Sequence, residues 1–200
     1  MPMQDNPNLT PVDHLISQKE RVANKGHRGG VFWLTGLSAS GKSTLAMHAE
    51  AVLQKKGMHT YVLDGDNVRR GLCGDLGFSD QDRVENIRRV SETAALMADA
   101  GLIVIAAFIS PFKQDREKAR ARCSDVFHEV FIKADLETCE KRDPKGLYEK
   151  ARAGNIPHFT GVGSPYEEPT APDLVLDTQA EDIDTCVKTL ADYIEQKVRL

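Results

Sequence analysis

Apolar and polar positions along the chain change period repeatedly, and the first change predicts a strand followed by a helix. Residues 30–35 form a short apolar run rich in β-forming residues. Apolar side chains then repeat at helical spacing over residues 45–53, and Gly57 is a plausible helix stop. A second strand is predicted over residues 59–63. The segment between the first strand and the first helix is therefore a βα loop.

The middle of the chain continues this alternation. A helix is predicted from about residue 80 to residue 100, with a buried stripe on one face made by Val84, Ile87, Val90 or Ser91, Ala94 and Met97. The unbroken apolar run at residues 102–108 predicts a central strand that is covered on both faces. A helix over residues 114–122 and a strand over residues 126–132 follow.

The last third of the chain first loses the alternation and then recovers it. Charged and loop-forming residues fill positions 135–172, and we expect a mobile cover, or lid, over about residues 143–170. A merely variable surface loop is an equally good interpretation of that composition. A strand over residues 173–176 and a helix end the chain; the apolar stripe of that helix is Ile183, Val187, Leu190, Ile194 and Val198.

Five strands alternating with helices predict a three-layer α/β/α sandwich with a mainly parallel five-stranded sheet. Residues 29–200 are expected to form one domain, because 200 residues suit a single core. Residues 1–28 are polar and rich in proline, with one short helical candidate at residues 13–23. We expect a loosely attached arm that packs across a partner subunit or over a bound nucleotide.

Composition excludes several classes of function. A formal net charge of −4 gives no global basic footprint for a nucleic acid polymer. No apolar run approaches the roughly 20 residues of a membrane span, and no secretory signal is recognisable at the N-terminus. The four cysteines are scattered without metal-ligand or redox spacing. These features predict a cytoplasmic protein, or one in an equivalent reducing compartment.

The loop after the first strand carries the clearest chemical signal, because GLSASGKS at residues 36–43 fits the pattern G-x-x-x-x-G-K-[ST] in full. Glycines let the backbone curl so that N–H groups point inward, and the following helix adds its positive dipole end. Lys42 is then expected to reach the β- and γ-phosphates of a triphosphate, and Ser43 to ligate Mg²⁺. The predicted nucleotide contacts are Gly36, Leu37, Ser38, Ala39, Ser40, Gly41, Lys42, Ser43 and Thr44.

Two acids follow the second strand, at the sheet edge where doubly wound sheets bind ligands. Asp64 and Asp66 are candidates for holding Mg²⁺ through water and for accepting a proton from an attacking hydroxyl. Sequence does not order the two. A helix N-cap and an Asx turn are alternative uses for either residue.

Arginines are dense over residues 69–89 in an otherwise acidic chain, which suggests an anionic second substrate. Arg83 and Asn86 are three positions apart and so share one helix face, opposite the buried stripe. For Arg69 and Arg83 we favour a substrate contact, and for Arg88 and Arg89 a solvated surface. Ser110, at the end of the central strand, is a credible active-site hydroxyl.

With these pieces in place, the chain closely resembles the adenylylsulfate kinases (APS kinases) from about residue 26 to the C-terminus. The matching motifs are GLSASGKS (36–43), DGDNVR (64–69), GL (71–72) with DLGFS (75–79), ENIRR (85–89), FISPF (108–112), KGLY (145–148), and FTG (159–161) with PYE (165–167). The departures are small: Ala39 stands where many members have glycine, and Cys73-Gly74 replaces a more polar stretch.

The resemblance implies a P-loop kinase that transfers phosphate from ATP, with Mg²⁺, to the 3′-hydroxyl of adenosine 5′-phosphosulfate. It also implies a homodimer, and the chain has no room for a fused ATP sulfurylase domain. Arg69 and Arg83 match residues that bind the phosphosulfate, and Phe78 and Phe159 match aromatics that sandwich the substrate adenine. The further substrate contacts it implies are Asn86, Ile109, Lys145, Leu147 and Thr160, and Arg142 matches the residue that packs the ATP base.

Ser110 matches a serine that is described in this family as a phosphoserine intermediate. In-line transfer needs no covalent step, so the same serine could instead hold substrate or product.

Two other interpretations compete with this one. A P-loop kinase for another hydroxylated metabolite is disfavoured by the paired arginines and paired aromatics. A nucleotide-binding regulator is disfavoured by the absence of an N-K-x-D motif after the loop and by the intact Lys42 and Ser43.

Overall fold

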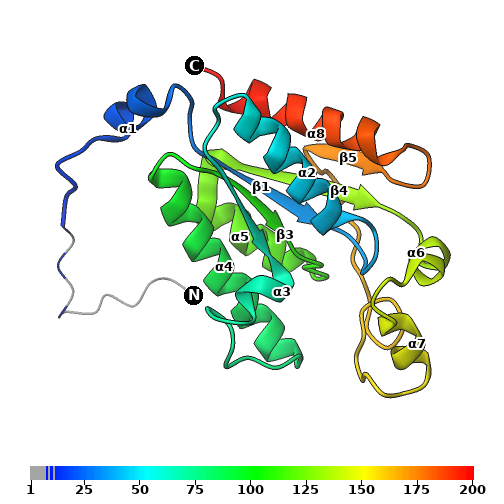
Figure 1. Cartoon of the computed structure of the whole chain (residues 1–200). Coiled ribbons are helices and arrows are strands. Elements are labelled where there is room, and N and C mark those ends of the chain that lie inside the picture. The colour runs from blue at the N-terminus through cyan, green and yellow to red at the C-terminus, as the bar shows by residue number, and fades with distance from the viewer. Residues whose placement is uncertain (1–7, 9, 11) are drawn as a thin grey trace.

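The computed structural model of the chain describes residues 8, 10 and 12–200. Five parallel strands form one sheet in the order β2-β3-β1-β4-β5 (Figure 1). The strands are β1 (Gly30–Thr35), β2 (Thr60–Asp64), β3 (Ile103–Ala107), β4 (Phe127–Lys133) and β5 (Leu174–Asp177). β1 and β3 are buried along their whole length, as expected for strands covered on both faces. The middle strand is β1, and β3, which was predicted to be the central strand, lies beside it. The predicted sandwich with a parallel five-stranded sheet is confirmed.

Helices cover both faces of this sheet. The longer ones are α2 (Lys42–Lys55), α4 (Asp80–Asp99), α5 (Lys113–Cys123) and α8 (Ile183–Val198). α2 and α8 pack together on one face, and α4 and α5 on the other (Figure 1). Each face has its own hydrophobic core, the first around Phe32 and Leu190, the second around Trp33 and Val90.

The shorter helices are α1 (Gln18–Lys25), α3 (Gly65–Val68), α6 (Leu136–Arg142) and α7 (Leu147–Arg152), with a 3₁₀ turn η1 (Ser124–Val126). α6 and α7 lie in the stretch where the sequence pattern predicted only loop, so that prediction was too coarse. A third, smaller apolar cluster lies beneath them and includes Leu37, Tyr148 and Phe159. The lid segment (residues 143–170) therefore shares a small core with the phosphate loop and α6.

Two further expectations from the sequence need correction. The N-terminal helix begins at Gln18 rather than Asp13, because Ser17 forms a capping box with Glu20 and so fixes the first turn. Of the predicted arm, residues 1–7, 9 and 11 lie outside the described residues. On α4, Val84 is 37% exposed whereas Asn86 is buried with the apolar stripe, so the buried face is rotated from the predicted one.

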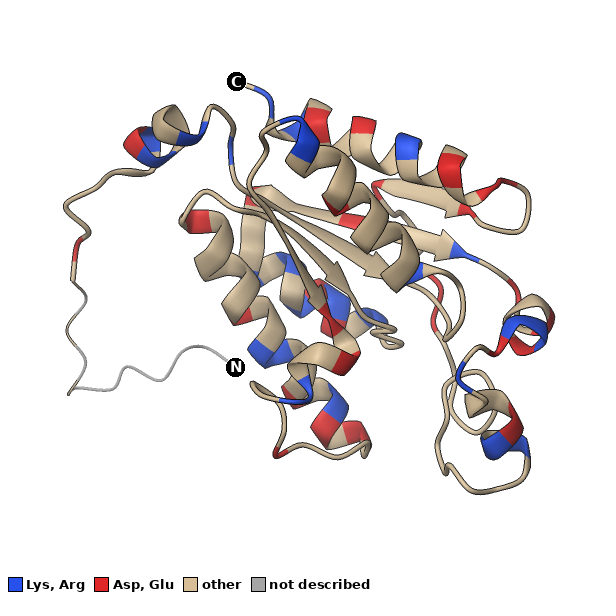
Figure 2. Cartoon of the chain, viewed as in Figure 1, with Lys and Arg blue, Asp and Glu red and all other residues tan. Residues whose placement is uncertain are grey.

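Charged residues lie mostly on the helices and in the loops, and β1 and β3 carry none (Figure 2). Among the described residues, no helix combines the length and apolar character needed to cross a membrane. The parallel register pairs Leu34 of β1 and Asp64 of β2 with the same residue, Ala107 of β3. The carboxyl ends of β1, β2 and β3 thus meet at one edge, where the candidate site lies.

Candidate active site

The phosphate loop joins β1 to α2, and its shape depends on close backbone approach. A Cβ atom at Gly36 would lie 2.5 Å from the carbonyl oxygen of Ile132, so only glycine fits there. Gly41 has φ 106° and leads directly into the first turn of α2. Ala39 has φ 61°, a left-handed conformation that residues other than glycine rarely adopt.

Lys42 is the first residue of α2, and its side chain is buried inside the loop. Its ammonium donates hydrogen bonds to the carbonyl oxygens of Gly36 (3.0 Å) and Leu37 (2.6 Å). Burial disfavours the charged form and lowers the pKa of Lys42 to about 8. A bound polyphosphate would supply the negative charge that this buried ammonium lacks.

Ser43 and Asp64 are in direct contact. The Ser43 hydroxyl donates a hydrogen bond of 2.6 Å to Oδ2 of Asp64, and Oδ1 of Asp64 accepts one from the backbone N–H of Asp66 at 3.0 Å. Asp64 is thus both the N-cap of α3 and the partner of the phosphate-loop serine. Thr44, next in the first turn of α2, is exposed.

Asp66 points a different way. Its carboxylate pairs with the ammonium of Lys145, which lies between α6 and α7 at the start of the lid segment. Both side chains are more than half exposed, so solvent screens the pair. The two predicted acids thus have different partners. Asp64 bonds to Ser43 beside the phosphate loop, and Asp66 pairs with Lys145 of the lid segment.

Arg142 and Thr178 lie beside the phosphate loop, next to Ser40. Arg142 donates hydrogen bonds to the hydroxyl of Thr178 (3.1 Å) and to its carbonyl oxygen (2.6 Å). The Thr178 hydroxyl in turn donates to the carbonyl oxygen of Ser40 at 2.9 Å. Sequence analysis singled out Arg142 but missed Thr178, which the pattern marks only as a residue just after a strand.

Arg83 bridges two segments that are far apart in the chain. Its guanidinium donates to the carbonyl oxygen of Phe78 (3.0 Å), to the hydroxyl of Thr160 (2.8 Å) and to the carbonyl oxygen of His158 (2.7 Å). Since a guanidinium has five N–H donors, it keeps donors for a further acceptor. Arg83 therefore brings the segments carrying Phe78 and Phe159 to one place.

The two predicted aromatics have unlike surroundings. Phe78 is 66% exposed, and the guanidinium of Arg69 lies 4.4 Å from its ring centroid. Phe159 is buried and meets Tyr148 edge to face, with ring centroids 5.0 Å apart. Tyr148 also donates from its hydroxyl to the carbonyl oxygen of Ser38 at 3.0 Å. Sequence analysis quoted Tyr148 only within the KGLY motif and gave it no role.

The remaining predicted contacts differ in accessibility. Ser110 is buried, accepts a hydrogen bond of 3.0 Å from Nε1 of Trp33, and has φ 39°. Ile109 beside it and Leu147 at the start of α7 are partly exposed. Asn86 is buried, and its Oδ1 atom has no hydrogen-bond partner among the described residues. An unpaired buried acceptor is unusual, and it fits a position that meets a ligand donor.

Arg88 and Arg89, the two arginines assigned to solvent, form surface ion pairs. Both contact Glu85, and Arg89 also contacts Asp75. These contacts lower the pKa of Glu85 to about 2 and belong to the outer face of α4.

The sheet is parallel, and its phosphate loop holds a buried lysine beside a serine–aspartate pair. With the arginines Arg69 and Arg83 also in the site, this arrangement defines a P-loop kinase. The family model for adenylylsulphate kinase matches residues 28–177. This chain belongs to the adenylylsulphate kinase family.

Several relatives match over nearly their whole length. The chain is 56% identical over 191 residues to the adenylyl-sulfate kinase of Marinobacter nauticus, covering 95% of this chain and 96% of that protein. It is 57% identical to the adenylyl-sulfate kinase of Shewanella amazonensis, covering 90% and 92%. The bifunctional enzyme NodQ of Azospirillum brasilense is 54% identical over 98% of this chain, which spans only 32% of that longer protein.

Among solved structures, the APS kinase CysC of Mycobacterium tuberculosis in complex with AMPPNP and APS superposes with a TM-score of 0.80. It is 51% identical, and the match covers 84% of this chain and 98% of that one. A gluconokinase from Sinorhizobium meliloti also superposes, with a TM-score of 0.55 at 18% identity, and that likeness shows the fold alone.

Proposed function

We propose that this protein transfers the γ-phosphate of ATP to the 3′-hydroxyl of adenosine 5′-phosphosulfate, producing 3′-phosphoadenosine 5′-phosphosulfate and ADP in sulfate assimilation. The observation that carries the proposal is the full phosphate-loop site with buried Lys42, in a chain whose full-length relatives are named adenylyl-sulfate kinases. The bound APS named for the Mycobacterium tuberculosis structure supports the same acceptor.

On the donor side, the loop amides of residues 36–43 and the N-terminus of α2 would bind the phosphates of ATP. Lys42 would neutralise charge on the β- and γ-phosphates, and Arg142 would pack the base. Ser43 and Asp64 offer hydroxyl and carboxylate oxygens, the donor set that Mg²⁺ prefers, so the residues fit this ion. When bound there, Mg²⁺ would neutralise charge on the phosphate oxygens.

On the acceptor side, Arg69 and Arg83 would bind the anionic phosphosulfate. Phe78 and Phe159 would pack against the adenine. The unpaired buried oxygen of Asn86 supports a hydrogen bond from the acceptor nucleotide. Ile109, Lys145, Leu147 and Thr160 would complete the pocket. Thr160 accepts a hydrogen bond from Arg83, and Lys145, two positions before Leu147, pairs with Asp66.

The general base is one of two carboxylates. The contact between Asp64 and Ser43 supports a place for Asp64 beside both Mg²⁺ and the reacting phosphate, whereas Asp66 lies paired with Lys145. We therefore favour Asp64 over Asp66 as the general base or the Mg²⁺ ligand. Comparing kcat of Asp64→Asn and Asp66→Asn tests this order, and a larger loss for Asp66→Asn would reverse it.

For Ser110, a positioning role has more support than a covalent one. Its hydroxyl is buried and already bonded to Trp33, and its carbonyl oxygen accepts from Arg116. Phosphate analysis of the enzyme after incubation with ATP alone would decide, because a phosphoserine intermediate would accumulate label at Ser110.

The wider assignments extend from the family. We propose a homodimer, an N-terminal arm over residues 1–28, a closing lid over residues 143–170 and a separate ATP sulfurylase that supplies the acceptor. A cytoplasmic location is supported by the cysteines, all four of which are free and buried.

The deciding experiment is an ADP-release assay with Mg²⁺ and ATP that compares adenylylsulfate, adenosine, shikimate and gluconate as acceptors. Release that depends on adenylylsulfate alone is the expected result. Comparable release with gluconate or shikimate would move the protein to the other class of P-loop kinase.

A further inference from the structure

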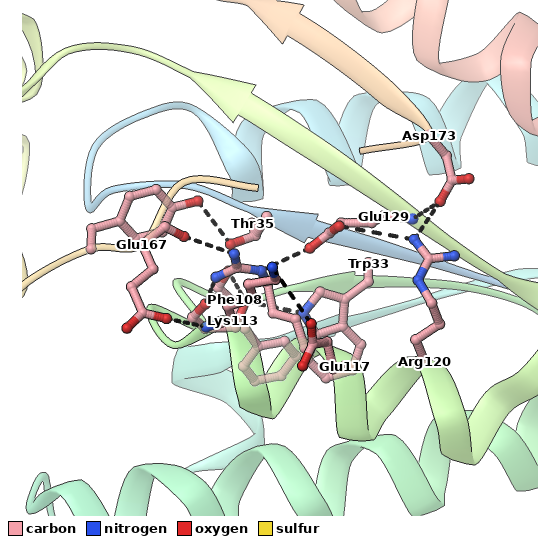
Figure 3. Close-up of polar contacts among 12 residues, drawn as sticks. Trp33, Thr35, Phe108, Lys113, Glu117, Arg120, Glu129, Glu167 and Asp173 are labelled. Atoms are coloured by element: carbon pink, nitrogen blue, oxygen red, sulfur yellow. Dashed lines mark hydrogen bonds and ion pairs between the residues drawn. The ribbon is translucent and has the colours of Figure 1, made fainter. Parts of the chain in front are cut away.

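The PYE motif at residues 165–167 matches the family but has no role in the site described so far. In the structure it lies against the loop that follows β3, residues 108–112, and against the start of α5 (Figure 3). Glu167 alone makes three contacts there. Its N–H donates to the carbonyl oxygen of Pro111 (2.9 Å), its carbonyl oxygen accepts from Arg116 (2.7 Å), and its carboxylate accepts from the backbone N–H of Lys113 (2.6 Å).

The carboxylate contact supplies a helix cap that the local sequence lacks. The N-cap residue of α5 is Phe112, which has no side-chain capping hydrogen bond. Glu167, 54 positions after Lys113, places a negative charge at the first turn of the helix instead. The C-terminal end of the lid segment is therefore attached to the N-terminus of α5.

Arg116 ties three segments together from the inside. Its side chain is 2% exposed and donates to Oε1 of Glu129 on β4 (2.7 Å), to the carbonyl oxygen of Ser110 (2.8 Å) and to that of Glu167. A buried guanidinium is costly unless it is paired and fully hydrogen-bonded. Here Nη1 of the guanidinium donates to the loop after β3, and Nη2 donates to the lid segment.

The same loop is held at its other positions too. The Thr35 hydroxyl donates to the carbonyl oxygen of Ile109 (2.7 Å), and the hydroxyl of Tyr166 lies 3.0 Å from that of Thr35. Three successive carbonyl groups of the loop, at residues 109–111, thus have partners. Ile109 is partly exposed between the buried Phe108 and Ser110, so the held backbone presents this one side chain outward.

We propose that Arg116, Tyr166 and Glu167 form a clasp that joins the base of the lid segment to the loop at residues 109–111, and that they are positioning residues for the acceptor nucleotide. The proposal rests on the proposed function, in which Ile109 contacts that nucleotide. The clasp acts on acceptor binding rather than on ATP, because the hydrogen bonds of Arg116 and Glu167 fix the backbone of the 109–111 loop and none is made to residues 36–44. Tyr166 approaches the phosphate loop most closely: it bonds Thr35 and packs against the cluster that includes Leu37.

The first test compares Arg116→Met with Arg120→Met. Arg120 lies one turn further along α5 and also approaches Glu129, at 3.9 Å, but contacts neither the 109–111 loop nor Glu167. For Arg116→Met we expect kcat/KM for adenylylsulfate to fall by about ten- to a hundredfold, as for a displaced binding group. The Kd for AMPPNP should stay within about twofold, and Arg120→Met should change neither value beyond about twofold. Arg116→Lys should recover part of the loss.

The second test avoids the buried ion pair, in case Arg116→Met does not fold. It compares Glu167→Ala with Glu168→Ala, an exposed neighbour without a hydrogen bond or ion pair in the part of the chain that the structure describes. For Glu167→Ala we expect a higher KM for adenylylsulfate and hydrogen exchange at Lys113 that is faster by about tenfold.

These measurements separate the clasp from the proposed function. If Glu167→Ala matches Glu168→Ala in either KM or exchange, or if Arg116→Met weakens AMPPNP as much as adenylylsulfate, the clasp is refuted. If the wild-type protein fails to phosphorylate adenylylsulfate, the proposed function falls and the positioning role with it, whereas unchanged exchange at Lys113 would reject the clasp even in an active enzyme.

Discussion

The proposed donor and acceptor sides of the site are built in different ways. On the donor side, Lys42 contacts carbonyl groups only five and six positions away, and glycine geometry sets the loop. On the acceptor side, Arg83 reaches Thr160 across 77 positions, and Lys145 reaches Asp66 across 79. One side is a local backbone structure, and the other is an assembly of long side chains from distant segments.

Burial differs at particular residues of the two sides. Lys42 and Asp64 are buried and Phe78, Asp66 and Lys145 are exposed, although Asn86 and Phe159 on the acceptor side are buried as well. The donor side is therefore preorganised for charge stabilisation, and the acceptor side has contacts that can break and re-form without opening the core. This difference predicts that variants on the two sides will change different kinetic constants.

The largest effect is expected from the donor side. Lys42→Ala should lower kcat by about 10²–10³-fold, because it removes one contact to charge that develops in the transition state. Steady-state ADP release measures it, with Lys55→Ala, at the far end of the same helix, as the matched control. Near-normal turnover of Lys42→Ala would remove the lysine from its assigned role.

The next effect concerns the acceptor side. Arg83→Ala should raise KM for adenylylsulfate by about tenfold or more, since hydrogen bonds to charged groups contribute about 1.5–3 kcal/mol. AMPPNP affinity, measured by calorimetry, should change little. Arg88→Ala is the control, because Arg88 pairs with Glu85 on the outer surface of α4. Equal losses for both ligands would place Arg83 outside the acceptor pocket.

The pH dependence of kcat/KM and of kcat should differ, because the first reports on the free enzyme and the second on the enzyme with bound ATP. With the pKa of Lys42 lowered to about 8, the ammonium is lost as pH rises through that value, so kcat/KM for ATP should decline above about pH 8. Bound phosphates favour the ammonium, so the decline in kcat should come at higher pH. The residual activity of Lys42→Arg should lack the limb near pH 8; a retained limb would belong to another group.

The smallest effect joins the two sides. Tyr148→Phe removes the hydrogen bond from the lid segment to the carbonyl oxygen of Ser38, at an expected cost of about 1 kcal/mol in unfolding free energy. Urea denaturation measures it. Tyr61→Phe, at an exposed position on β2, should leave that free energy unchanged. Equal values for the two variants would mean that this bond does not hold the lid segment in solution.

Local sequence signals predicted well wherever the structure is local. The apolar runs of β1 and β3 and the glycine and lysine spacing of the phosphate loop could be recognised without tertiary information, although the close approach that requires Gly36 is to Ile132 on β4. Periodicity was less reliable on α4: it put Val84 inside and Asn86 outside, since helix packing, and not the sequence period, decides which face turns inward.

The connections between segments could not be predicted in the same way. Arg116 resembles any surface arginine of a charged helix, yet it is buried beneath the lid segment, and Glu167 caps a helix that begins 54 positions earlier. By itself, then, the sequence determined the five strands, the phosphate loop and the family resemblance, because these can be recognised from short-range spacing. Only the tertiary structure decided which distant side chains meet, because a hydrogen bond between segments exists only once the sheet has brought their ends to one edge.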